Sequence, residues 1–287
     1  MSYCTGCSIR CPGHIVILID GAANMATYYM DNETRISFVE RCVNNIIKGL
    51  FCECISGISI KNRVFVSLYE YSEEGVILLL QDFIIQLCAG LFKIDKEAKL
   101  IEGLEVSHMG GGRLSDALDA VADELIFWKE SIKEEGKYVV SERWDEGTSS
   151  YIQRTINVLD PCVAPLVLNF TKGFPTFDSE LDVLSSIDKL KAVSYTDGVP
   201  LFYNILMPLY DERELYNISK EQVDERWGLL YEISSDFPSY QKTSYRIDLE
   251  KGIILNPKDP QVIFDILVKP WFYPVRTTGR PIEGEIE

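Results

Sequence analysis

Histidine is almost absent from this 287-residue chain, which has only His14 and His108. Neither histidine lies in a His-Glu-x-x-His pattern, and no Gly-x-Ser-x-Gly sequence occurs, so a zinc protease or a serine hydrolase is poorly supported. The chain also lacks a P-loop ending in Gly-Lys-Ser/Thr, and no Gly-x-Gly-x-x-Gly follows the first apolar segment. These absences argue against a histidine-dependent or nucleotide-binding enzyme.

Positive charge and long apolar runs are scarce as well. The chain has 28 Lys and Arg against 44 Asp and Glu, a net charge of −16 and a pI near 4.6. Such a balance excludes a general nucleic-acid binder and adhesion to anionic membranes, because both need clustered cations. Apolar runs such as Val76–Leu80 are too short to span a bilayer, and the first fifteen residues have no signal-peptide pattern. We therefore expect a cytoplasmic protein that binds neither nucleic acid nor membrane.

Cysteines are too few for a disulfide scaffold, at eight in the whole chain. Cys4, Cys7, Cys11 and His14 nevertheless supply four soft ligands within a short stretch, which zinc or an iron–sulfur cluster could use. However, zinc sites usually take their ligands from two separated pairs, and His14 begins an apolar strand. We favour a thiol-bearing N-terminal arm without metal, and we expect no cofactor.

Apolar strands alternate with amphipathic helices along most of the chain. Patterns typical of buried strands occur at residues 14–20, 165–170, 201–207 and 252–255, and a hairpin pattern occurs at 63–71 and 76–88. Helical periodicity occurs at residues from about 34 to 50 and at 114–132, 179–192, 221–233 and 260–268. This alternation predicts an α/β fold: a doubly wound, mostly parallel sheet with one antiparallel edge strand and helices on both faces.

The predicted organisation is one large domain with additions. Residues 1–13 form a Cys-rich arm and 14–274 a single domain. Within that domain, 133–162 are predicted to be an insertion that packs lightly, and 211–274 a C-terminal extension packed on it. Residues 275–287 are a predicted flexible tail.

Ligands of such sheets bind beyond the carboxyl ends of the strands, which points to three loops at residues 20–25, 108–113 and 171–176. The first loop, Asp20-Gly-Ala-Ala-Asn-Met25, begins at the last residue of the strand at 14–20. The second is His108-Met-Gly-Gly-Gly-Arg113, and the third is Thr171-Lys-Gly-Phe-Pro-Thr176. In this order, the three resemble the motifs of von Willebrand factor A domains: Asp-x-Ser-x-Ser, Gly-Gly-Thr and Thr-Asp-Gly-x-Pro-Thr.

The resemblance implies a metal-ion-dependent adhesion site, in which oxygen ligands hold Mg²⁺ and a partner's carboxylate completes its coordination. Here the family's ligand positions are altered, and the matching residues are Asp20, Ala22, Asn24, Gly112 and Lys172. Asp20 keeps its carboxylate and Asn24 still offers a carbonyl, but Ala22 and Gly112 lack a hydroxyl and Lys172 brings a positive charge. Mg²⁺ binding is therefore disfavoured.

Two interpretations of Lys172 remain open. Its ammonium could take the metal's electrostatic role and neutralise Asp20. Alternatively, Lys172 extends into solvent and Asp20 only caps the turn that follows it.

Three C-terminal segments refine the resemblance. Residues 201–205, 230–235 and 252–256 are similar to bacterial von Willebrand A proteins of the tellurium-resistance-associated type. That type implies a cytoplasmic adaptor with a protein kinase and a PP2C-type phosphatase as partners.

We therefore predict a non-enzymatic protein-interaction module with a degenerate, metal-free adhesion site. Its candidate partner contacts are Met109, Arg113, Phe174, Trp144 and Tyr151, because exposed aromatic and arginine side chains dominate protein interfaces. Phe174 could instead cap the sheet, and Trp144 and Tyr151 could cover a small apolar cluster. The alternative function is an enzyme that uses the strand-end crevice for hydrolysis or the N-terminal cysteines for metal-thiolate chemistry.

Overall fold

The computed structural model describes residues 6–30, 33–57, 59–88, 100–104, 111–132, 138–157, 159–174, 177–209 and 213–273. The strands of its main sheet are Gly13–Asp20 (β1), Val64–Ser72 (β6), Gly75–Phe83 (β7), Leu166–Thr171 (β10), Leu201–Leu206 (β11) and Ile253–Leu255 (β12). Their spatial order is β12-β11-β10-β1-β6-β7, and every pair is parallel except β6 with β7. The predicted doubly wound sheet with one antiparallel edge strand is confirmed.

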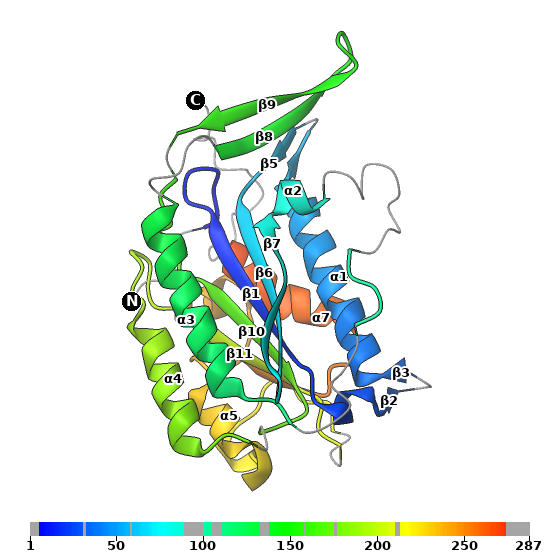
Figure 1. Ribbon diagram of the computed structural model, residues 1–287, viewed down its shortest axis with the longest axis vertical. Helices are drawn as coiled ribbons and strands as arrows, with labels where there is room; N and C mark the ends of the chain where they lie inside the picture. The colour runs from blue at the N-terminus through cyan, green and yellow to red at the C-terminus, as the bar shows by residue number, and fades with distance from the viewer. Residues whose placement is uncertain are drawn as a thin grey trace.

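Helices cover both faces of this sheet (Figure 1). The α-helices are Arg35–Cys54 (α1), Ile84–Cys88 (α2), Leu114–Ser131 (α3), Glu180–Ala192 (α4), Gly228–Ile233 (α5), Ser239–Tyr245 (α6), Pro260–Ile263 (α7) and Lys269–Phe272 (α8). A π-helical turn, Phe264–Val268, joins α7 to α8. Short 3-10 helices span Ala23–Ala26, Lys220–Gln222 and Glu225–Trp227.

Strand β1 divides the core into two apolar layers. Its side chains alternate, so Ile15, Ile17 and Ile19 pack with α1 while Val16 and Leu18 pack with α3 and α4. A strand buried on both faces needs apolar residues at every position, which explains the continuous run in the sequence.

Polar residues at the helix ends explain where the helices begin. Thr34 accepts a hydrogen bond from the Ser37 amide at the start of α1. Ser179 and Asp182 form a reciprocal capping box on α4. The sequence identifies both starts because the capping residues lie next to the apolar periodic segments.

A second, smaller sheet lies at one end of the molecule and includes much of the segment 133–162, which was predicted to be an insertion. Its strands are Ile55–Ser56 (β4), Ser59–Lys61 (β5), Tyr138–Asp145 (β8) and Ser150–Ile156 (β9), in the order β4-β5-β8-β9. The predicted insertion thus contains a hairpin of β8 and β9 that pairs with β5. A two-stranded ribbon, Tyr28–Met30 (β2) and Glu33–Thr34 (β3), lies at the opposite end (Figure 1).

Two further element predictions need correction. The predicted strand at 76–88 ends at Phe83, and the residues after it form α2, in which Ile84, Ile85 and Cys88 are buried. The predicted helix at 221–233 is broken into two 3-10 turns before α5.

The chain on either side of the sheet packs against it. Cys7 is buried, and its amide donates to the Phe272 carbonyl over 3.2 Å. Trp271 is also buried, and its Nε1 donates to the Ala164 carbonyl. From residue 6 onward, the N-terminal arm is therefore held against α8. Among the described residues, no helix is both long and apolar enough to cross a membrane.

Candidate functional site

The main sheet follows the order 3-2-1-4-5-6 when its strands are numbered along the chain, so its direction of winding reverses between β1 and β10. Ligands of open α/β sheets bind at this switch point, beyond the carboxyl ends of the two strands. Asp20 ends β1 and Thr171 ends β10. The first and third predicted loops therefore start at the switch point, and Gly112 of the second lies beside Asp20.

Asp20 is 1% exposed and both its carboxylate oxygens have partners in the chain. Oδ1 accepts a hydrogen bond from the Ala22 amide over 3.0 Å, and Oδ2 accepts one from the Thr171 hydroxyl over 2.9 Å. Burial raises the pKa of Asp20, although the hydrogen bonds from Ala22 and Thr171 and the charge of Lys172 act to lower it. Asp20 thus caps the turn after β1 and ties it to β10.

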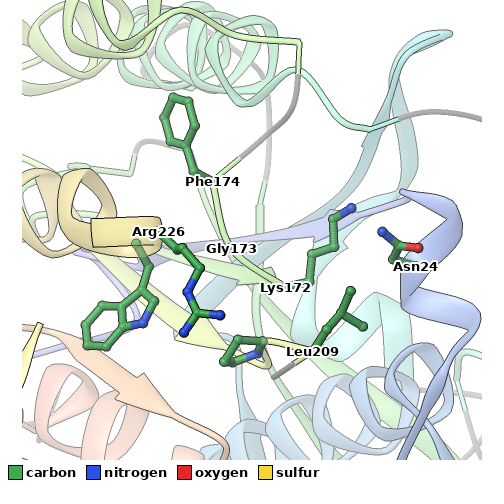
Figure 2. Close-up of a pocket in the computed structure, with 8 residues that line it drawn as sticks. Asn24, Lys172, Gly173, Phe174, Leu209 and Arg226 are labelled. Carbon is green, nitrogen blue, oxygen red and sulfur yellow. The ribbon is translucent and has the colours of Figure 1, made fainter. Parts of the chain in front are cut away.

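Lys172 does not form an ion pair with Asp20 in the described part of the chain. Figure 2 shows its side chain extended toward Asn24 instead. Of the two interpretations of Lys172, the contacts of Asp20 match the one in which its carboxylate caps the turn. The ammonium still acts on Asp20 over a longer distance, because its charge opposes the rise in the pKa of that carboxyl.

The space beside Gly112 is filled by Tyr71, from the end of β6. A Cβ atom on Gly112 would lie 2.6 Å from the Tyr71 ring and 3.2 Å from Asp20 Oδ1. Tyr71 is fully buried, and its hydroxyl donates to Asn169 Oδ1 over 2.9 Å. Asn169 in turn donates to Asn204 over 2.8 Å. The ring is therefore fixed beside Gly112, where it leaves no room for a larger side chain.

These residues do not fit a Mg²⁺ ion. A small hard cation needs about six oxygen ligands in octahedral geometry. Ala22 and Gly112 offer no side-chain oxygen, both oxygens of Asp20 are occupied, and Lys172 brings a positive charge to the loop. Among the described residues, no group of three or more His, Cys, Asp and Glu side chains is placed to hold a metal ion.

The N-terminal ligand set is also separated by the fold. Cys4 lies outside the described residues. Cys7 packs in the layer of α1, whereas His14 contacts Phe65 and Trp128 on the other face of the sheet. Because the sheet stands between them, Cys7 and His14 cannot share an ion.

His14 instead forms a buried polar cluster with Ser67 and Glu124. Its Nε2 lies 2.9 Å from Ser67 Oγ and 3.2 Å from Glu124 Oε1, and Tyr69 donates to Glu124 Oε2 over 2.6 Å. Burial raises the pKa of Glu124, but the His14 charge and the hydrogen bonds outweigh it and lower the pKa to about 2. Serine and carboxylate meet the same imidazole nitrogen, so the cluster is not a catalytic triad, in which they would use opposite nitrogens.

A shallow cleft of about 180 Å³ opens beside these loops, and we call it the switch-point cleft. Its lining residues are Asn24, Lys172, Gly173, Phe174, Pro208, Leu209, Arg226 and Trp227. In Figure 2, Lys172 and Asn24 lie at one side, and Phe174 points away from them. Arg226 already binds Asp224, with Nη2 and Oδ2 2.7 Å apart. Lys172 has no such carboxylate partner among the described residues.

Arg35, at the start of α1, holds the backbone of Pro208, one of the residues that line the cleft. Its guanidinium is buried and donates to the carbonyls of Met207, Pro208 and Tyr28 over 2.7, 3.0 and 2.7 Å. Desolvation lowers the pKa of Arg35. One side chain therefore joins the segment at residues 28–35 to the segment at 207–208, which is distant in sequence.

The predicted partner contacts do not share one site. Phe174 lines the cleft while also packing against the apolar layer of α3, and Arg113 is exposed at the start of α3. Trp144 and Tyr151 lie on the β8–β9 hairpin at the other end of the sheet, and Met109 falls outside the described residues.

Sequence reasoning missed half of the residues that line the cleft. Pro208, Leu209, Arg226 and Trp227 come from segments that carry no motif, and Tyr71, which packs beside Gly112, was missed as well. Asp178 was missed as well, although it accepts hydrogen bonds from the amide and hydroxyl of Ser115 and so joins the third loop to the start of α3. The available signal was position: Tyr71 is the last residue of the strand predicted at 63–71, and Asp178 follows the third loop closely.

Comparisons with known proteins give structural similarity only. No protein-family model matches the sequence, and no curated protein matches it. Among solved structures, the SpRpn10 VWA domain is similar at 11% identity and a TM-score of 0.45, covering 94% of this chain and 100% of that one.

A von Willebrand factor type A protein from Catenulispora acidiphila is similar at 11% identity and a TM-score of 0.37, covering 68% of this chain and 33% of that one. Proximal thread matrix protein 1 from the mussel byssus is similar at 12% identity and a TM-score of 0.40, covering 80% of this chain and 43% of that one. The chain thus matches less than half the length of these two proteins. At such scores, we draw no functional conclusion from any of the three.

Proposed function

We propose that this chain is a von Willebrand A-type protein-interaction module whose switch-point cleft binds a partner without a metal ion. The single observation that carries the proposal is Lys172, a cation at the switch point in place of the family's second aspartate. It has no carboxylate partner among the described residues. An ammonium there suits an acidic side chain of a partner, which the metal would bind in the unaltered site.

The walls of the cleft support a protein partner rather than a substrate. Pro208, Leu209 and Phe174 give it apolar sides, and its volume of about 180 Å³ is smaller than the 300–1,000 Å³ typical of small-molecule pockets. No histidine, cysteine, serine or carboxylate lines the cleft in the part of the chain that the structure describes. This composition supports a non-enzymatic role, because Lys172 is the one side chain among these that could act as a nucleophile or base, and no second such group accompanies it.

The narrower assignment rests on sequence resemblance alone. In it, the chain is a cytoplasmic bacterial adaptor of the tellurium-resistance-associated type, and its partners are a protein kinase and a PP2C-type phosphatase. Residues 201–205, 230–235 and 252–256 are its only support.

Affinity capture from an extract of the source cells, carried out in EDTA, tests the proposal. The immobilised chain is compared with Lys172→Glu and with Lys258→Glu, a charge reversal at an exposed residue that does not line the cleft. We expect partners that are retained by the wild type and by Lys258→Glu and that are lost with Lys172→Glu. Partners that bind only when Mg²⁺ is added, or equally well to Lys172→Glu, would overturn it.

A further inference from the structure

We propose that the free edge of β9 is a second interaction surface, which binds an acidic, extended segment of a partner protein as an added strand. This inference goes beyond the proposed function, because β9 lies at the end of the molecule opposite the switch-point cleft (Figure 1). It rests on three features of the small sheet: an unpaired edge, a basic face and an exposed aromatic pair.

The edge is open along most of its length. Strand β9 pairs with β8 on one side, and within the described ranges no strand pairs with its other side. Every residue from Ser150 to Thr155 is exposed. Such a strand presents unpaired backbone N–H and C=O groups, which an extended peptide can complete by β-augmentation.

The hairpin is held firmly enough to present this edge. Asn62 donates from its backbone amide to the Val140 carbonyl over 2.7 Å and from Nδ2 to the Val139 carbonyl over 2.9 Å. Val140 is itself buried, at the bulge where β8 leaves the main domain. A fixed edge loses less conformational entropy on binding than a mobile loop.

One face of the small sheet gathers cations in an otherwise acidic protein. Directly opposed residues of antiparallel strands point to the same face. Lys61, Ser141 and Arg154 therefore form one row across three strands, and Ser59, Arg143 and Ile152 form the next. Asp145 ends this face at the turn, where its carboxylate accepts hydrogen bonds from the Gly147 amide and the Thr148 hydroxyl.

Three cations on one small face contrast with the net charge of −16 for the whole chain. Charge complementarity selects an acidic occupant for this face. For an antiparallel strand added to β9, a carboxylate beside Arg154 and an apolar residue two positions later beside Ile152 would match the exposed side chains.

The other face adds an aromatic contact. Trp144 and Tyr151 are opposed across the hairpin with ring centroids 5.0 Å apart, and they are 42% and 40% exposed. Residues of the added strand that point to this face would pack on the pair, and aromatic side chains are typical anchors of protein interfaces.

A second copy of the chain is a poorer occupant. Antiparallel pairing of β9 with itself would bring two copies of the basic face side by side, and like charges on adjacent strands are destabilising. The net charge of each chain adds repulsion between copies. We therefore assign the edge to a different, acidic protein.

The test uses the full chain and a short blocked peptide with the repeat Glu-Thr-Val-Thr, in which glutamate and valine alternate along one face of the added strand. Amide chemical shifts of the ¹⁵N-labelled protein locate the binding, and fluorescence polarisation measures its strength. We expect shifts concentrated in β9 and binding that weakens as salt rises. Arg143→Glu/Arg154→Glu should weaken binding by about tenfold or more, because both side chains lie on the exposed basic face.

Controls separate this surface from the cleft and from simple charge attraction. Lys258→Glu and Lys172→Glu should leave peptide binding unchanged, and a lysine-for-glutamate peptide should not bind. A peptide whose backbone is N-methylated at alternate residues should also fail, because it cannot add a strand.

Three results would overturn the proposal: no shifts in β9, equal binding of the N-methylated peptide, or equal binding by the double arginine variant. A concentration-dependent dimer that disappears in the double variant would also overturn it, since a second copy would then cover the edge. If partners fail to bind the cleft while the peptide still binds β9, only the proposed function fails. If the peptide fails to bind β9 while partners still bind the cleft, only the present proposal fails.

Discussion

The two ends of strand β1 each hold a buried carboxylate, and they hold it in opposite ways. At the amino end, Glu124 meets the His14 imidazole and receives hydrogen bonds from Ser67 and Tyr69, so its pKa is lowered to about 2. At the carboxyl end, Asp20 is sealed by Ala22 and Thr171 without an ion pair, and burial raises its pKa.

The difference is that folding favours the charged form of Glu124 and disfavours the charged form of Asp20. The His14 imidazole and the hydrogen bonds from Ser67 and Tyr69 together offset the desolvation of Glu124. Asp20, at the carboxyl end of β1, has only neutral hydrogen-bond donors in contact. The positive charge that acts on Asp20 belongs to Lys172, and the Lys172 side chain extends toward the cleft.

The largest effect is expected at the amino end. A carboxyl whose pKa falls from 4.5 to about 2 on folding stabilises the fold at neutral pH by about 3 kcal/mol. Because the folded pKa is the lower one, this contribution is present above about pH 4.5 and is lost as the pH falls toward 2. We expect Glu124→Gln to lower the free energy of unfolding by about 3 kcal/mol at pH 7, measured by urea denaturation.

The pH dependence of that loss is the control. The difference in the free energy of unfolding between the wild type and Glu124→Gln should shrink when both proteins are denatured with urea near pH 3. An equal difference at both pH values would mean that packing, and not charge, accounts for the effect.

A smaller effect is expected from placing a threonine at Gly112. Gly112→Thr would force a side chain against the Tyr71 ring, at 2.6 Å from its Cβ. Overpacking of this kind costs about 1–3 kcal/mol of unfolding free energy, measurable by thermal denaturation. The same substitution should cost less in a Tyr71→Ala background, in which the ring is gone. If Gly112→Thr were neutral alone, Tyr71 would not be what excludes the threonine.

The smallest effect is expected at Asp20. Its raised pKa means that the ionised form is destabilised by folding, and this cost appears as the pH rises through the folded pKa. An asparagine keeps an oxygen for the Ala22 amide, and its Nδ2 can donate to Thr171 Oγ1 while that hydroxyl donates to the Gly173 carbonyl.

We therefore expect the stability of Asp20→Asn at pH 7 to stay within about 1 kcal/mol of the wild type or to rise. Urea denaturation at pH 4 and pH 7 measures it, and any gain should be larger at pH 7. A large loss at pH 7 would show that the negative charge of Asp20 is needed.

The main sheet was predictable because its signals are local. The continuous apolar run at Ile15–Ile19 and the helical spacing of 114–132 each reflect burial by elements that the sequence pattern itself defines. Asp20, Lys172 and Gly112 were placed near one another because parallel strands bring their carboxyl ends to the same edge.

The hairpin and the walls of the cleft were not predictable, for different reasons. Strand β9 is exposed on both faces, so it has none of the apolar alternation that marks a half-buried strand. The positions of Tyr71 and Arg226 depend on contacts between segments that are far apart in the chain, which no local pattern encodes. The role of Asp20 as a turn cap likewise required the position of Thr171, on a strand 151 residues later.

Titration of the purified full chain with Mg²⁺ and Mn²⁺ by isothermal calorimetry tests the central claim most directly. That claim is that the switch-point site works without a metal ion. We predict no saturable binding of either ion by the wild type or by Asp20→Ala. Stoichiometric binding by the wild type that Asp20→Ala abolishes would contradict it.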